Sequence, residues 1–146
     1  MSDDQTLAKA PKALRPRLPV NRDNAFWIEG VRAGKLLVQR CNSCAALRYP
    51  PAPMCGCCQS LDWETAQISG SGLIYSYVVH HKPPLPGFTT PYAILLVELK
   101  AGIRVLGNLV DAPIEVLKIG LPVEVVFRTD PGDDYVLPHW RPRGAS

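Results

Sequence analysis

Apolar and polar residues alternate along the second half of the chain with the period of two that is typical of half-buried β-strands. Five segments carry this pattern or a nearly continuous apolar run: residues 72–79, 92–99, 103–110, 122–128 and 135–141. The second is expected to be buried on both faces because it is apolar almost throughout. Pro138 would restrict the last strand to a sheet edge, since proline donates no backbone hydrogen bond. Five such strands predict a small Greek-key barrel, the OB-fold, over residues 65–146.

Two interruptions of the strand pattern have an expected structural meaning. Gly107 lies inside the third strand, where glycine usually marks a bend of a barrel and less often the close approach of a ligand, so we expect a bend. Residues 80–91 join the first two strands and contain four prolines. Long loops without secondary structure are usually functional or disordered, and the prolines stiffen this one, which favours a functional role.

An amphipathic pattern with the helical period covers residues 21–34. Asn21 or Asn24 can cap the start of this helix, and Gly34 can end it. The apolar side consists of Phe26, Trp27, Ile28 and Val31. A helix this short is marginal alone and must dock, either on its own chain or on a partner protein. Both alternatives remain open at this stage, and Phe26 and Trp27 are the candidate partner-binding residues.

Two C-x-x-C pairs provide the most specific motif of the chain, within a zinc ribbon expected at residues 35–64. Each pair folds into a tight turn whose two sulfurs converge on one ion, which makes a tetrahedral four-thiolate site. The expected ligands are Cys41, Cys44, Cys55 and Cys58, and the expected metal is one structural zinc ion per chain, with iron as the alternative. Cys57 is left over. Ala45 and Gln59 stand where many such turns have glycine.

The odd number of cysteines, arranged in metal-binding pairs, indicates a reducing compartment, and the cytoplasm is the expected location. Residues 1–20 contain three prolines and no apolar core, so they are expected to be a flexible arm and neither a secretory signal nor a membrane span. The longest purely apolar run, residues 92–97, is far too short to cross a membrane.

Charge bears on the possible partners. Residues 1–50 hold nine Lys and Arg against four Asp and Glu, whereas residues 65–146 hold seven of each. A neutral barrel binds a phosphate backbone poorly, although Tyr75, Tyr77 and Phe88 could stack on bases. Binding of single-stranded nucleic acid is therefore the alternative function and not the preferred one.

An enzyme needs a nucleophile with a base in reach, paired carboxylates or an open metal site. The candidates are His80, His81, His139 and the spare Cys57. Four thiolates fill the coordination sphere of zinc, and Cys57 lies inside a metal-binding turn. Adjacent histidines point to opposite sides of an extended chain, so at most one of His80 and His81 can enter a given site. We therefore expect no active site in this chain.

The chain resembles a family of small proteins, first catalogued as a domain of unknown function, with a rubredoxin-like zinc ribbon followed by an OB-fold. The resemblance is carried by FWIEGVRAGKLLVQRCNSC, YPPAPMCGCC, SGSGLIYSYVVHHKPPLPGF, PYAILLVEL, VLGNLV and IGLPVEVVF. It implies a non-catalytic accessory subunit of a thiolase-like enzyme in acyl-CoA metabolism, with an acyl-CoA hydratase as another possible partner. The metal ligands carry over onto Cys41, Cys44, Cys55 and Cys58.

Under this interpretation the basic segment from Arg15 to Arg40 docks on the partner. Four cations could attract the phosphates of coenzyme A or acyl-CoA, with an ordinary solvated face as the alternative: Arg32, Lys35, Arg48 and Lys82.

Overall fold

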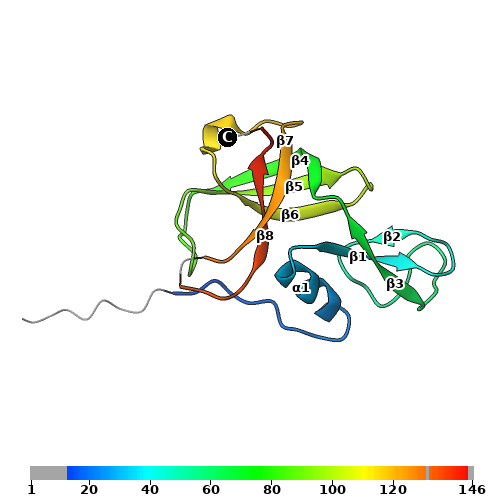
Figure 1. The fold of residues 1–146 in the computed structure, drawn as a ribbon. Coiled ribbons are helices and arrows are strands. Elements are labelled where there is room, and N and C mark those ends of the chain that lie inside the picture. Colours follow the sequence, from blue (N-terminus) through cyan, green and yellow to red (C-terminus); the bar gives the residue numbers. More distant parts are fainter. Residues whose placement is uncertain (1–12, 131, 145–146) are drawn as a thin grey trace, which may run out of the picture.

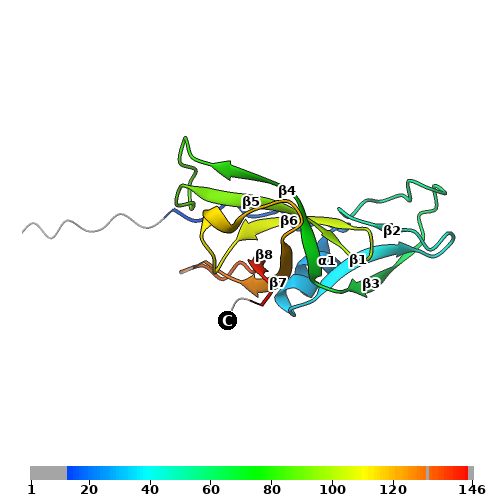
Figure 2. The same cartoon turned by 90° about the horizontal axis from the view of Figure 1, so that it is seen from above.

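The structure, a computed structural model, describes residues 13–130 and 132–144. The elements in chain order are α1 (Ala25–Arg32), β1 (Leu36–Cys41), β2 (Leu47–Arg48), β3 (Trp63–Ile68), β4 (Ser71–His80), β5 (Tyr92–Leu99), β6 (Arg104–Leu109), the 3-10 turn η1 (Ile114–Val116), β7 (Pro122–Arg128) and β8 (Leu137–Pro142). A three-stranded ribbon projects from one side of a closed barrel, and α1 lies against both (Figures 1 and 2). The predicted mainly-β class, with one short helix, a ribbon and a five-stranded barrel, is confirmed.

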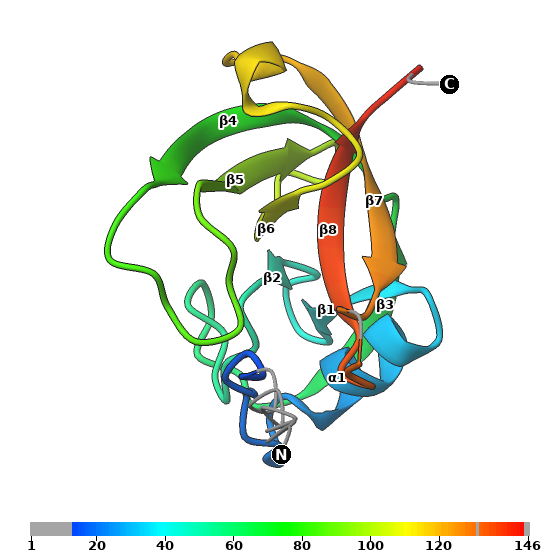
Figure 3. The same ribbon diagram turned by 90° about the vertical axis from the view of Figure 1, so that its left-hand side faces the viewer.

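The barrel closes in the order β4-β5-β6-β8-β7, with β7 returning to β4 (Figure 3). The strand pairs are antiparallel except for β6 and β8, which run parallel where Asn108 pairs with His139 and Leu109 with Trp140. The expectation that Pro138 places β8 at an edge is wrong, since β8 lies between β6 and β7. Pro138 is tolerated because it precedes the two residues that pair with β6, so its missing N–H is not needed there.

Burial along β5 alternates strictly. Ala93, Leu95, Val97 and Leu99 face the barrel core, whereas Ile94 and Leu96 remain half-exposed and Glu98 is exposed. The prediction that this strand is covered on both faces is therefore wrong. Its outer face is apolar in sequence but has no layer packed over it within the described residues.

Gly107 accommodates a side chain from the core. A Cβ atom at this position would lie 2.8 Å from Cδ1 and Nε1 of Trp140, which is fully buried. The expected barrel bend is thus not the reason for this glycine, because the close approach of the Trp140 indole to the β6 backbone leaves no room for a side chain.

The helix packs on its own chain. Trp27, Ile28 and Val31 are buried and contact Tyr49 of the ribbon segment and Phe127 and Val136 of the barrel. The helix begins at Ala25, later than expected, because Asn21 closes a preceding turn by accepting the N–H groups of Asp23 and Asn24. It ends before Gly34, which has a φ of 72° as its role as terminator requires.

Two further segments lie at the expected domain boundaries. Strand β3 crosses the expected ribbon–barrel boundary at residue 65, and along its whole length it pairs with β1 in the ribbon sheet. The expected arm of residues 1–20 is described only from residue 13, and from there it is tied to the barrel. Arg15 forms a 2.6 Å ion pair with Asp130, and the Leu18 N–H donates to the Tyr135 hydroxyl. Residues 1–12 lie outside the described part.

Candidate metal centre

Two turns of the same design present the cysteine pairs. In the first, the Cys41 N–H donates to the Ala46 carbonyl at 2.9 Å, and the Ala45 N–H donates back to the Cys41 carbonyl at 3.0 Å. In the second, the Cys55 N–H donates to the Ser60 carbonyl and the Gln59 N–H donates to the Cys55 carbonyl, both at 2.9 Å. Ala45 and Gln59 have φ values of 60° and 63°, which explains why glycine is common at these positions. Each turn therefore contains one non-glycine residue with a left-handed backbone conformation.

The four predicted ligands converge. The Sγ atoms of Cys41, Cys44, Cys55 and Cys58 all lie within 4.8 Å of one another. Two of these sulfur–sulfur distances are 3.5 Å, between Cys41 and Cys58, and 3.6 Å, between Cys44 and Cys55. Sulfurs at the corners of a tetrahedron around zinc lie about 3.8 Å apart, given a Zn–S bond of about 2.3 Å. The cluster therefore has the size and donor chemistry that a tetrahedral zinc ion requires.

The electrostatics of the cluster also favour a cation. Backbone N–H groups of Cys58 and Cys57 lower the pKa of Cys55 to about 6, and those of Cys44 and Ser43 lower the pKa of Cys41. At Cys44 the Ala46 N–H acts in the same direction, but the thiol donates to neighbouring sulfurs and its pKa is raised to about 12. Four thiolates cannot coexist at this distance without a positive charge between them. A divalent ion supplies that charge.

Cys57 stands apart from this cluster. It occupies the position in the second turn that Ser43 occupies in the first, and its side chain is exposed. It is not among the four residues whose sulfurs converge.

The structure does not assemble the candidate catalytic residues into a site. His80 contacts the Pro83 carbonyl oxygen through Nε2 at 2.6 Å, His81 is exposed in the following loop, and His139 is buried in the barrel. Among the described residues, the cysteine cluster is the one group of three or more His, Cys, Asp or Glu side chains with metal-binding geometry.

The aromatic residues considered for base stacking are engaged within the chain. Arg104 lies 3.6 Å over the ring of Tyr75, and the Tyr77 hydroxyl donates to the Leu117 carbonyl. Phe88 stacks on Tyr92 at 4.6 Å and is covered by the Arg15 guanidinium at 4.2 Å.

The cations considered for coenzyme A differ in their availability. Arg32, Lys35 and Lys82 are exposed. Arg48 is held inside the ribbon, where its Nε donates to the Oε1 of Gln39 at 2.8 Å. Gln39 is fully buried and also accepts the Ala52 N–H, so it fastens the segment after β2 to β1. Gln39 was not singled out from the sequence. The one feature that could have indicated its role is that it is a polar residue after the apolar run of β1.

Phe26 and Trp27, the candidate partner anchors, are both packed on the chain itself. Trp27 is 8% exposed, and its ring lies 6.4 Å from that of Tyr49. Phe26 is half-buried, with its ring centroid 4.9 Å from that of Trp63. Of the two docking alternatives for the helix, packing on its own chain accounts for most of this aromatic surface.

Family models match both modules of the chain. The model for the ChsH2 rubredoxin-like zinc ribbon domain matches residues 29–64, and that for the ChsH2 C-terminal OB-fold domain matches residues 65–128. A DUF35 domain-containing scaffold protein of Methanocaldococcus jannaschii is 37% identical over 106 residues, which make up 70% of this chain and 75% of that protein. This chain belongs to the ChsH2/DUF35 family. The resemblance found in the sequence is confirmed.

Two other similar proteins bear on function. A solved structure described as "Ltp2-ChsH2(DUF35) aldolase" is 44% identical, with a TM-score of 0.80, and the match covers 86% of this chain and 98% of that chain. A probable enoyl-CoA hydratase alpha subunit of Thermomonospora curvata is 47% identical over 140 residues, which are 95% of this chain but 43% of that protein. This chain therefore spans less than half of that hydratase subunit.

Within the described residues, no helix has both the length and the apolar character needed to cross a bilayer.

Proposed function

We propose that this chain is a non-catalytic, zinc-binding accessory subunit that assembles with a thiolase-type enzyme acting on acyl-CoA in the cytoplasm. Three relatives support the proposal: a scaffold protein, an aldolase whose description pairs ChsH2(DUF35) with a second component, and an enoyl-CoA hydratase alpha subunit. In this role Cys41, Cys44, Cys55 and Cys58 hold a structural zinc ion, which stabilises the ribbon without taking part in a reaction.

The observation that carries this proposal is an apolar face on the outside of the barrel. We call it the outer face and define it as Val78, Ile94, Leu96 and Leu106. Val78 is 58% exposed and Leu106 is 57% exposed. Cross-strand pairing places Val78 beside Ile94 and Leu96 beside Leu106, so these side chains form one continuous surface over β4, β5 and β6. A contiguous apolar surface of this kind is typical of a protein-binding site.

The shape of the outer face fits a protein better than a small ligand. A groove on this face has a volume of about 210 Å³, and apolar side chains and Ser76 line it. So small and shallow an apolar groove cannot enclose a drug-sized molecule or orient it by polar contacts. An apolar protein surface can cover it without such contacts, as interface cores do. The partner in this proposal is therefore the enzyme subunit itself.

Three exposed cations complete the proposal. Arg32, Lys35 and Lys82 are exposed and can attract the phosphates of coenzyme A or acyl-CoA bound by the complex. Arg48 is less suited to this role because it is bonded to the buried Gln39.

The test is co-purification with the thiolase-type enzyme of the same organism. Val78→Glu combined with Leu106→Glu puts two charges into the outer face, and we expect the affinity to fall at least 100-fold, because desolvating unpaired carboxylates at an interface is strongly unfavourable. Ile119→Glu is the matched control, since Ile119 is 65% exposed and lies outside this face. It should leave the affinity unchanged.

Undiminished binding by the double variant would show that the outer face is not the docking surface. Stable self-association of the wild-type chain that the double variant abolishes would show that a second copy, and not the enzyme, covers this face. The zinc content of every variant is measured in parallel, so that a loss of ribbon structure is recognised.

A further inference from the structure

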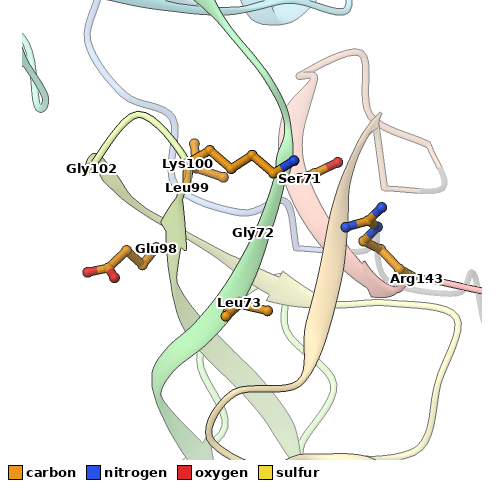
Figure 4. Close-up of a pocket in the computed structure, with 8 residues that line it drawn as sticks. All are labelled: Ser71, Gly72, Leu73, Glu98, Leu99, Lys100, Gly102 and Arg143. Carbon is orange, nitrogen blue, oxygen red and sulfur yellow. The ribbon is translucent and has the colours of Figure 1, made fainter.

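A pocket at one end of the barrel lies apart from the cysteine cluster and carries two cations. Its volume is about 420 Å³. The residues that line it come from β4, the end of β5, the β5–β6 turn and the segment after β8: Ser71, Gly72, Leu73, Glu98, Leu99, Lys100, Gly102 and Arg143 (Figure 4). Segments that are distant in sequence thus meet at one concave site.

The pocket has uncompensated positive charge. Glu98 is already paired with Arg104 at 2.9 Å, and Glu124, which lies beside Ser71 in the strand pairing, is paired with Arg141 at 2.7 Å. Lys100 and Arg143 form no ion pair with any residue in 13–130 or 132–144. The carboxylates around the pocket therefore do not neutralise its two cations.

The polar groups of the pocket converge. Figure 4 shows Lys100 and Arg143 reaching toward Ser71 from opposite sides, while Glu98 points away. The Ser71 hydroxyl donates to no acceptor within the described residues. An ammonium group, a guanidinium fork and a hydroxyl together supply donors in several directions around one point, which suits a tetrahedral oxyanion with several acceptor oxygens.

Part of the pocket is apolar. Leu99 is buried beneath it, and Leu73 is 51% exposed at its side. A purely inorganic anion would leave the Leu73 side chain in water, whereas a ligand that joins an anion to an apolar group would cover it.

We propose that this pocket binds an organic phosphate, with the phosphate group between Lys100 and Arg143 at the Ser71 hydroxyl and the apolar group against Leu73. A phosphate monoester carries a charge of about −1.5 to −2 at neutral pH, which matches two cations better than a single carboxylate does. The site does not depend on the zinc ion, the outer face or the partner enzyme.

The experiment is a titration of the full-length zinc-loaded chain with phenyl phosphate, followed by amide proton–nitrogen NMR at constant ionic strength. We expect saturable shifts at Ser71, Gly72 and Gly102, and binding by inorganic phosphate that is at least threefold weaker. Lys100→Gln combined with Arg143→Gln should weaken phenyl phosphate binding at least tenfold. Both side chains are exposed, and the dispersion of the spectrum reports whether the variant is folded.

Lys118→Gln is the matched control, because Lys118 is exposed, forms no ion pair among the described residues and does not line the pocket. It removes one positive charge and should leave the affinity unchanged. The proposal is overturned by shifts that do not saturate, by equal shifts when sodium chloride replaces the phosphate, or by unaltered binding in the folded double variant. Equal affinity for phenyl phosphate and inorganic phosphate would overturn the role of Leu73.

Discussion

Cys57 and Cys58 are neighbours in the chain but differ in their relation to the metal centre. The Cys58 sulfur belongs to the four-sulfur cluster, whereas Cys57 is exposed beside it. We expect Cys58→Ser to lose its zinc and to destabilise the ribbon severely, because a structural zinc site contributes on the order of 10 kcal/mol to folding. Cys57→Ser should retain one zinc ion per chain. Elemental analysis of the purified variants measures both outcomes.

The opposite pattern, in which Cys57→Ser loses the metal and Cys58→Ser keeps it, would show that the ligand assignment is wrong. Iron in the wild-type protein would leave the ligands unchanged but would replace zinc as the metal.

His139 makes stability depend on pH. It is 3% exposed, and its Nδ1 atom has no hydrogen-bond partner within the described residues. Burial lowers its pKa, with nearby Arg15 and Arg128 acting in the same direction and Asp130 opposing them. The unfolded chain binds a proton at this histidine below about pH 6.5, whereas the folded chain binds it only at lower pH. Protonation of His139 therefore does not affect the free energy of unfolding above about pH 6.5. As the pH falls below that value, protonation favours the unfolded chain and the free energy of unfolding decreases.

Urea unfolding between pH 7.5 and 5.5 measures this dependence. His139→Gln should remove up to about 1.4 kcal/mol per pH unit from the slope below pH 6.5. His81→Gln, which changes an exposed histidine, is the control and should keep the wild-type slope. If His139→Gln also keeps it, the acid sensitivity of the protein resides elsewhere.

At the scale of elements, helix α1 joins the ribbon to the barrel. Its buried cluster, which includes Trp27, contacts Tyr49 of the ribbon segment and Phe127 and Val136 of the barrel. We expect Trp27→Ala to lower the free energy of unfolding by about 3–5 kcal/mol, because it leaves a large cavity between the modules. Glu29→Ala, an exposed position on the same helix, should change it by less than about 0.5 kcal/mol. Urea unfolding of both variants tests this.

A Trp27→Ala variant of unchanged stability that no longer binds the partner enzyme would contradict the intrachain role and restore the alternative of a partner-binding helix.

Strands whose apolar and polar residues alternate clearly could be predicted from the sequence, and strands without this alternation could not. Residues 72–79 and 92–99 carry enough apolar positions to be recognised as strands, and the structure places β4 and β5 there. Strand β3 was missed because Ala66 is its one fully buried residue and its outer residues are polar. Its existence depends on pairing with β1, which no local pattern of residues 63–68 reveals.

At the scale of the whole molecule, the fold class and the four-cysteine cluster could be predicted because their signals are local. The cysteine spacing within each turn is enough to bring two sulfurs together, and two such turns make the site. The phosphate pocket could not be predicted, since Lys100 and Arg143 meet only when the end of β8 returns to the β5–β6 turn. The same holds for residues 13–20, where Arg15 reaches Asp130 and Asn108 across the folded barrel.

Closure of the barrel has a consequence for how such a protein changes over evolutionary time. Within the described residues each barrel strand has a paired neighbour on both sides, and β5 pairs with β4 and with β6 along most of its length, so its main-chain groups are engaged inside the barrel wall. Recognition through the barrel wall therefore depends on side chains such as Val78 and Leu106, which contribute little to the core. Those positions can be replaced one at a time while the scaffold persists, which would allow a single architecture to acquire new partners by drift at its surface.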